Sequence, residues 1–213
     1  DGDGDGDGDG EPCGPECCPG EQQCNGEIAE TCNEDGTAWE QEEFCDPIQG
    51  LVCNPDFGGC EGACSAEAIG LSYIGCDYFP TVTQQEDNYD QAPHQFAVTV
   101  ANVGNEDANI TVTRGDMDVT NAVVAPGNVD VIPLPWIPQL TNGSGPSLVV
   151  PDGAYRLRSD VPVVVYQYNP VGATVTNDAS ILLPVNAWGE EVAVAAWSHW
   201  GGFFNYPSMY AVV

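Results

Sequence analysis

Apolar and polar residues alternate along most of the chain after Leu71, in short runs rich in valine, isoleucine, threonine and tyrosine. In residues 96–100 and 110–114 apolar side chains alternate with threonine, which is typical of a strand that buries one face and exposes the other. Residues 161–168, VPVVVYQY, are almost continuously apolar, so we expect a central strand there. The runs that we interpret as strands are 71–79, 96–103, 108–114, 128–135, 147–150, 154–159, 161–168, 179–185, 191–197 and 209–213.

Turn-forming residues separate these runs about every ten positions. The clearest turn signals are Val103–Asn105, Ala125–Asn128, Pro151–Gly153 and Ser159–Asp160. This spacing predicts an antiparallel β-sandwich of Ig-like, Greek-key type over residues 67–213. Because the sequence stops within the apolar run 209–213, we expect the natural protein to continue or this strand to pair with another chain.

A different pattern fills residues 13–66, where cysteines alternate with glycine, proline, asparagine and aspartate. The stretch 24–45 predicts a β-hairpin with residues 33–36 as its turn and Trp39 packed over a disulfide. Close CxxC pairs are absent and the chain has two histidines, so the cysteines indicate disulfides rather than zinc. The pairing stays open for these cysteines: Cys13, Cys17, Cys18, Cys24, Cys32, Cys45, Cys53, Cys60, Cys64 and Cys76.

Such a cysteine density is typical of exported proteins, and it predicts an extracellular or surface location. The fold class expected for the whole chain is therefore all-β, with a small disulfide-rich module before the sandwich. No stretch approaches the roughly 20 apolar residues of a membrane-spanning helix. We expect no direct membrane span, although a lipid anchor upstream is compatible with this sequence.

The chain is strongly acidic, with 33 Asp and Glu residues, 3 Lys and Arg residues and a formal net charge of -30. Residues 1–67 hold 19 of the acidic residues and no Lys or Arg. Nucleic acids and anionic lipids bind through cations that this chain lacks, so neither is an expected partner. Divalent cations or basic partners fit the charge better, whereas solubility in salty surroundings explains it without any ligand.

An Asp-Gly repeat occupies residues 1–10 and, with Glu11 and Pro12, forms an acidic tract before the cysteines. Carboxylates at every second position of a glycine-rich backbone can fold around hard cations, so we expect calcium as the one candidate ligand and no required cofactor. The calcium-loop pattern of an EF-hand also fits residues 5–16, but its flanks cannot be helical. A solvated linker is the alternative. The candidate ligands are Asp1, Asp3, Asp5, Asp7 and Asp9.

Residues 155–197, YRLRSDVPVVVYQYNPVGATVTNDASILLPVNAWGEEVAVAAW, resemble the bacterial IgGFc-binding protein family, large predicted surface lipoproteins of myxobacteria and their relatives. Residues 96–115, 125–135 and 24–39 resemble the same proteins, and the resemblance covers about residues 20–213. It implies an extracellular, β-rich, non-catalytic region near the N-terminus of a longer chain. It implies neither antibody binding nor any particular site residue.

Several short motifs suggest binding or modification. An aromatic cluster near the C-terminus could dock a partner or stack on sugars if exposed, and would close the end of the sandwich if buried. Asn109 and Asn142 begin glycosylation acceptor sequences, and residues 114–116 spell Arg-Gly-Asp, which we interpret as a tight turn. The aromatic candidates for a partner surface are Trp197, Trp200, Phe203, Phe204 and Tyr206.

Motifs for catalysis are lacking: the sequence contains no GxSxG, HExxH or glycine-rich phosphate loop, and no pair of carboxylates stands out. We therefore expect no enzyme activity. The first hypothesis is an adhesion or binding protein that contacts other protein chains, cell surfaces or polysaccharide. The alternative is a structural subunit of an extracellular fibre or matrix, a homo-oligomer assembled through its chain ends and through calcium.

Overall fold

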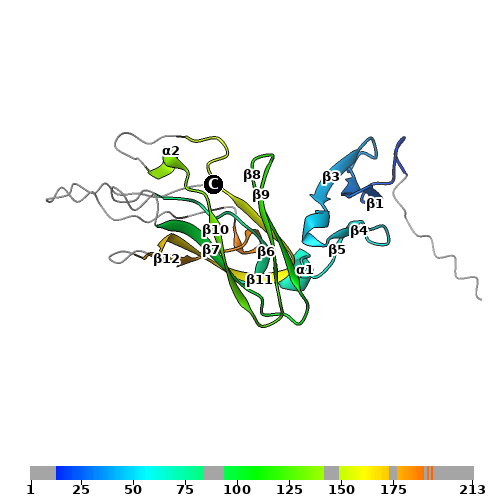
Figure 1. Ribbon diagram of the computed structural model, residues 1–213. Coiled ribbons are helices and arrows are strands. Elements are labelled where there is room, and N and C mark those ends of the chain that lie inside the picture. Colours follow the sequence, from blue (N-terminus) through cyan, green and yellow to red (C-terminus); the bar gives the residue numbers. More distant parts are fainter. Residues whose placement is uncertain are drawn as a thin grey trace, which may run out of the picture. The chain divides into compact units, whose positions relative to one another are not determined.

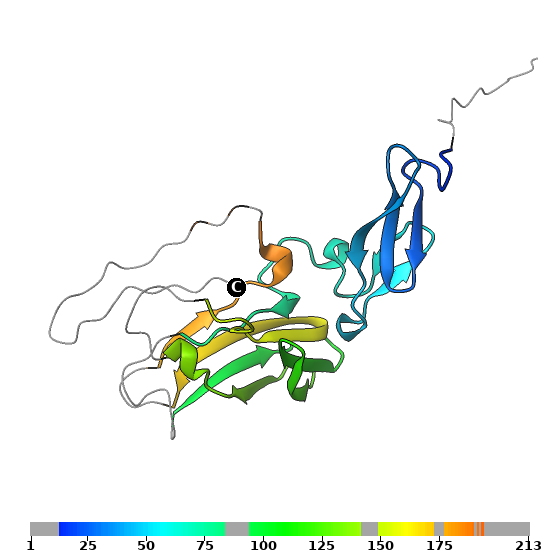
Figure 2. The ribbon, with the colours of Figure 1, turned by 90° about the horizontal axis from the view of Figure 1, so that it is seen from above.

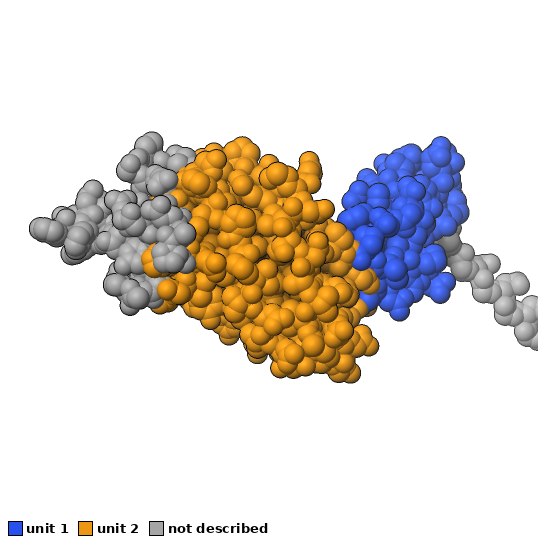
Figure 3. All heavy atoms as spheres, viewed as in Figure 1, with its two compact units in different colours: residues 1–47, 51–62 blue, residues 48–50, 63–213 orange. Residues whose placement is uncertain are grey.

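The computed structural model describes residues 13–83, 94–141, 149–172, 177–189, 191 and 193. The chain divides into two compact units, Asp1–Pro47 with Leu51–Gly62, and Ile48–Gly50 with Ala63–Val213 (Figure 3). Both units are mostly β-structure, which confirms the predicted fold class at that level.

The first unit holds two small antiparallel sheets. One has the order β1-β2-β3, formed by β1 (Gln22–Asn25), β2 (Ile28–Cys32) and β3 (Trp39–Phe44). The other pairs β4 (Val52–Asn54) with β5 (Gly59–Glu61). The predicted hairpin is confirmed as β2–β3, and Trp39 is the register partner of the disulfide-bonded Cys32. A short 3-10 turn, η1 (Pro47–Gln49), follows β3.

Disulfides replace a hydrophobic core in this unit. Its buried apolar residues are four cysteines together with Ala29 and Leu51. Because so little apolar surface is removed from water, covalent bonds have to supply much of the stability. All ten cysteines are paired: Cys13–Cys18, Cys17–Cys32, Cys24–Cys53 and Cys45–Cys60 in the first unit, and Cys64–Cys76 in the second.

The second unit is built on one curled antiparallel sheet of seven strands, a half-barrel (Figures 1 and 2). Its central path runs β10-β7-β11-β8-β9, and β6 and β12 also pair with β11. The strands are β6 (Gly75–Tyr78), β7 (Gln95–Ala101), β8 (Ala108–Arg114), β9 (Met117–Val124), β10 (Val129–Leu134), β11 (Arg156–Val171) and β12 (Ala179–Ile181). Short helical turns are α1 (Ala66–Ile69), α2 (Pro138–Thr141) and η2 (Val185–Ala187).

The long strand β11 explains why the sheet curls instead of forming two separate layers. Its first part pairs with β8 and β6, and its second part pairs with β7 and β12. The pairing shifts register between Arg158 and Val163, where the neighbours of β11 change. The antiparallel β-domain that we predicted is thus confirmed, with one strand shared by its two halves.

The strand prediction is wrong at Ser159–Asp160, at Val149–Val150 and in the second part of 179–185, where β12 stops at Ile181 and Val185 begins η2. Ser159 and Asp160 do not form a turn: the Ser159 hydroxyl donates to the Val161 carbonyl at 2.7 Å, and Asp160 accepts from the Asn109 main chain at 2.8 Å. Both polar side chains are therefore satisfied inside β11. Val149 and Val150 are not in a strand, and Val149 is exposed.

A single hydrophobic core fills the concave side of the sheet and includes Phe96, Ile110, Leu157 and Val165. Asn102, almost fully buried, holds the turns at one end of the sheet. Its Nδ2 donates to the carbonyls of Val124 and Glu106 at 2.8 and 2.7 Å, and its Oδ1 accepts from the main chain of Gly104. This clamp fixes the chain where it crosses from β7 to β8 and from β9 to β10.

Candidate functional site

Several residues singled out in the sequence lie outside the described residues. These are the acidic tract with Asp1, Asp3, Asp5, Asp7 and Asp9, the acceptor Asn142, and the aromatic cluster of Trp197, Trp200, Phe203, Phe204 and Tyr206. Asn109 is described on β8, where its side-chain amide and its main-chain N–H both donate to the Asp160 carboxylate. The Arg-Gly-Asp sequence forms the tip of the β8–β9 hairpin, with Gly115 at φ 54°.

The convex side of the sheet differs between its two halves. Side chains alternate along a strand, so the neighbours of core residues on β7, β10, β11 and β12 point outward. We call this set the outer apolar face. Its members are Ala97, Thr99, Ala101, Val129, Val131, Pro133, Val164, Tyr166, Tyr168, Ala179 and Ile181.

Strand register arranges this face in rows. One row joins Val131, Thr99, Tyr166 and Ile181 across four strands, and the next joins Pro133, Ala97, Tyr168 and Ala179. Adjacent strands lie about 4.8 Å apart, so each row is roughly 15 Å wide. Val131 is 57%, Ile181 43% and Tyr166 39% exposed. The apolar side chains in contact with solvent therefore include Val129, Val131, Tyr166 and Ile181, whereas Ala97, Thr99 and Val164 within the face are buried.

The small residues in the centre of the face are buried although they point outward. Ala97 and Thr99 point outward, yet Ala97 is fully buried and Thr99 nearly so. The Thr99 hydroxyl has no hydrogen-bond partner. Its register partners on the neighbouring strands are the apolar Val131 and the aromatic Tyr166.

The other half of the sheet has a mainly polar convex side, which we call the outer polar face, although Val123 on β9 is exposed there. Its principal row joins Asp77, Arg158, Thr111 and Asn121, and the next joins Arg156, Thr113 and Asp118. Arg156 donates to the Asp77 carboxylate from Nε at 3.0 Å and from Nη2 at 2.7 Å. This bidentate pair joins Asp77 of the principal row to Arg156 of the next row.

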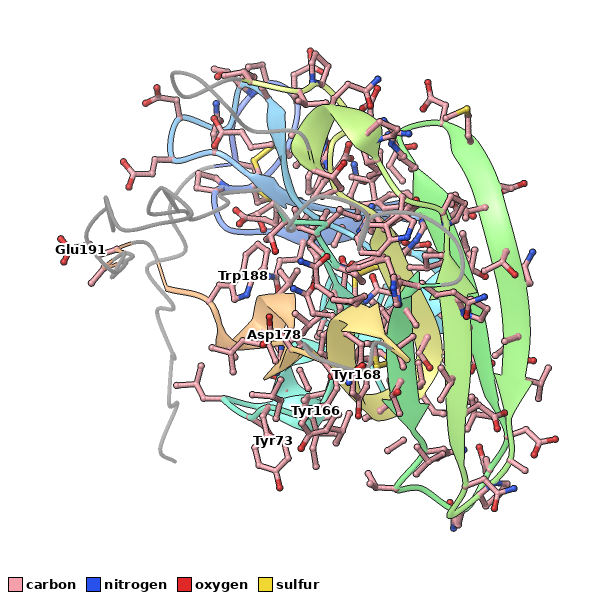
Figure 4. The ribbon with its side chains drawn as sticks, turned by 60° about the vertical axis from the view of Figure 1, so that its left-hand side comes forward. Tyr73, Tyr166, Tyr168, Asp178, Trp188 and Glu191 are labelled. Atoms are coloured by element: carbon pink, nitrogen blue, oxygen red, sulfur yellow. A yellow bond between two sulfur atoms is a disulfide. The ribbon has the colours of Figure 1, made fainter. Side chains whose placement is uncertain are left out.

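Trp188 and Phe79 lie beside that ion pair. The Arg156 guanidinium lies 5.9 Å from the centroid of the Phe79 ring. The ring centroids of Phe79 and Trp188 are 5.6 Å apart. The Trp188 indole N–H donates to the Leu183 carbonyl, and the ring is 42% exposed. Figure 4 shows Trp188, Tyr73, Tyr166, Tyr168 and Asp178 on the side of the sheet that carries β12 and η2.

Buried tyrosines support the site from the concave side. The Tyr78 hydroxyl donates to the Val163 carbonyl at 2.6 Å, beside the register shift of β11. The Tyr155 hydroxyl donates to the Pro135 carbonyl, also at 2.6 Å. Burial raises the pKa of Tyr78 far above its ordinary value, and raises that of Tyr155 as well. Both hydroxyls therefore remain neutral donors at physiological pH.

Within the described ranges, no group of three or more His, Cys, Asp or Glu side chains is placed to hold a metal ion. The same part of the chain contains no helix of the length and apolarity that a membrane span requires. The described part of the chain brings together an apolar sheet face, a neighbouring ion pair and exposed aromatic rings.

Sequence reasoning missed the outer apolar face. The signal was present in residues 161–168, whose continuous apolar character indicates a strand with two apolar sides. We interpreted this run only as a central strand. In residues 129–133 the outward positions are valine and proline. A strand with one face in solvent usually carries polar residues at those positions, so this run also gave a signal.

Comparison with protein families, with curated proteins and with solved structures found no match to this chain.

Proposed function

We propose that this protein is a non-catalytic extracellular binding module that adheres through its outer apolar face. The observation that carries the proposal is the row Val131, Thr99, Tyr166 and Ile181, which exposes apolar side chains across four strands. Large exposed apolar patches are uncommon on monomeric soluble proteins and often mark interaction sites. The polar row on the other half shows that the sheet does not need an apolar exterior to fold.

The disulfides support an extracellular setting. Five disulfides persist in oxidising surroundings, which are found outside the cytosol. The resemblance to bacterial IgGFc-binding surface proteins adds display on a bacterial outer surface to this proposal. The Ig-like sandwich expected from the sequence would also fit this setting, because such sandwiches are frequent in cell-surface domains.

A bead assay tests adhesion. Beads carry the wild-type protein, the double variant Val131→Asn/Tyr166→Asn or the control Val123→Asn, and attachment to cells of the organism that encodes the protein is counted. Val123 is a matched control because it is exposed to the same 57% as Val131 and lies on β9, in the other half. We expect the wild type and the control to attach, and the double variant to attach about tenfold less. Equal attachment of all three would rule out the face, and no attachment by the wild type would contradict adhesion.

A structural role in an extracellular fibre is the second candidate, and the acidic tract with its alternating carboxylates favours it. Molar mass by light scattering, with calcium and then with a chelator, tests this role. Large assemblies that dissociate on chelation would support calcium-dependent assembly. A 22.5 kDa monomer under both conditions would contradict it for this chain.

A further inference from the structure

We propose that the occupant of the outer apolar face is a cationic amphipathic protein segment, with apolar side chains towards the face and lysine or arginine at its margins. This inference rests on the proposed function and adds the chemistry of the partner. It combines two properties of the face, its apolar surface and the sign of the charges around it.

The shape of the face suits an extended segment or a second sheet. Its outward residues lie in three parallel rows that begin with Val129, Val131 and Pro133 on β10. A partner strand places alternate side chains on one side at a spacing of about 7 Å, which matches the spacing of outward residues along each of these strands. Tyr166 and Tyr168 are two such successive outward positions on β11.

Charge selects the type of partner. All three cationic side chains, Arg114, Arg156 and Arg158, belong to β8 or to the first part of β11, in the half with the outer polar face. The four strands of the outer apolar face carry no lysine or arginine outside that first part of β11. An exposed carboxylate next to the face in sequence is that of Asp178, just before β12, whereas Asp130 alternates with the outward Val129 and Val131 and so points to the other side of the sheet. A partner with cationic margins gains attraction there, and an acidic partner is repelled.

The same charges disfavour a second copy of this chain as the occupant. Each copy has a formal charge of -30, and two outer apolar faces would bring carboxylates to the same margins without a cation to offset them. A polysaccharide is disfavoured for another reason. The polar side-chain atoms in the two principal rows are the hydroxyls of Tyr166, Tyr168 and the buried Thr99, too few to pair with the many hydroxyls of a sugar chain.

The test measures the binding of short synthetic peptides to the whole protein by fluorescence anisotropy. The first peptide alternates valine and lysine, the second alternates valine and glutamate, and the third alternates serine and lysine. We expect the valine–lysine peptide to bind at least about tenfold more tightly than either of the others. Val131→Asn should weaken that binding about tenfold, and Val123→Asn should leave it unchanged within about twofold.

Three results would overturn the proposal. Equal affinity for the valine–lysine and serine–lysine peptides would mean that charge alone drives binding, and equal affinity for the valine–glutamate peptide would mean that charge is not used. An effect of Val123→Asn as large as that of Val131→Asn would place the peptide elsewhere. A panel of immobilised oligosaccharides is tested in parallel. If a glycan captures the wild-type protein and Tyr166→Asn abolishes that capture, the partner is a polysaccharide and the proposal is wrong. If the peptides fail while bead attachment still depends on Val131 and Tyr166, the adhesion function stands and only the partner chemistry is wrong.

Discussion

The two halves of the curled sheet share one core but present opposite exteriors. On the first, Asp77 and Arg156 form a bidentate ion pair and the row around Arg158 is polar. On the second, Val131, Tyr166 and Ile181 expose apolar surface. Because both halves fold on the same concave core, the core does not require either exterior. This difference is the basis of our proposal that the apolar exterior contacts another molecule.

The largest effect should come from a residue that both halves need. Leu157 lies on β11, is fully buried and belongs to the common core. Leu157→Ala should lower the free energy of unfolding of the second unit by about 2–5 kcal/mol, because it leaves a cavity. Hydrogen exchange should speed up in both β8 and β10. Faster exchange in β8 alone would mean that the two halves unfold independently. Their stability would then not depend on one shared core.

Removal of the ion pair should cost stability without affecting adhesion. Asp77 is largely buried, and Asp77→Ala leaves the Arg156 guanidinium without its carboxylate. We expect the free energy of unfolding to fall by about 1–3 kcal/mol, measured by chemical denaturation. Bead attachment should match that of the wild type, provided that the variant is folded at the assay temperature. Loss of attachment in a folded variant would extend the site to the outer polar face.

The Tyr78 hydroxyl should matter for stability and for its pH dependence. Tyr78→Phe leaves the Val163 carbonyl without its donor, and we expect a loss of about 1–2 kcal/mol. Burial raises the pKa of Tyr78 in the folded protein above the value in the unfolded chain. Its contribution is thus complete below about pH 10 and declines at higher pH, because only the unfolded chain releases the proton there. Denaturation curves at rising pH should show a shallower alkaline loss for Tyr78→Phe, and an unchanged slope would contradict this assignment.

The smallest effect on stability should come from the outer apolar face itself. Val131→Thr keeps a β-branched side chain at an exposed position, so the free energy of unfolding should change by less than about 0.5 kcal/mol. Binding of the valine–lysine peptide should nevertheless weaken, because a hydroxyl replaces a methyl group in the contact. A large loss of stability would mean that Val131 serves the fold, and the functional contrast between the two halves would lose its basis.

The sequence predicted the parts of the fold that depend on local chemistry. Alternation identified β7 and β8, glycine and proline marked the turns before β8 and β10, and the continuous run 161–168 identified the central strand. It missed β9, in which half of residues 117–124 are exposed and the sequence shows little alternation. It also divided β11 at Ser159, because the hydrogen bonds that satisfy Ser159 and Asp160 come partly from β8, distant in sequence.

The candidate site was harder to predict than the fold. An outward valine on β10 becomes part of a surface only when β7, β11 and β12 place Thr99, Tyr166 and Ile181 in the same row. That register is set by long-range pairing, which a pass along one chain does not reveal. Cysteine pairing was open for the same reason, since ten cysteines allow many arrangements and the fold selects one.

Hydroxyl-radical footprinting tests most directly whether the outer apolar face is where a partner binds. The protein is exposed to radicals alone and with the valine–lysine peptide, and the oxidation of Tyr166, Tyr168 and Met117 is measured by mass spectrometry. Met117 is exposed on β9, in the other half, and serves as the internal control. We predict protection of Tyr166 and Tyr168 with Met117 unchanged. Protection of Met117 while both tyrosines stay equally reactive would contradict the account.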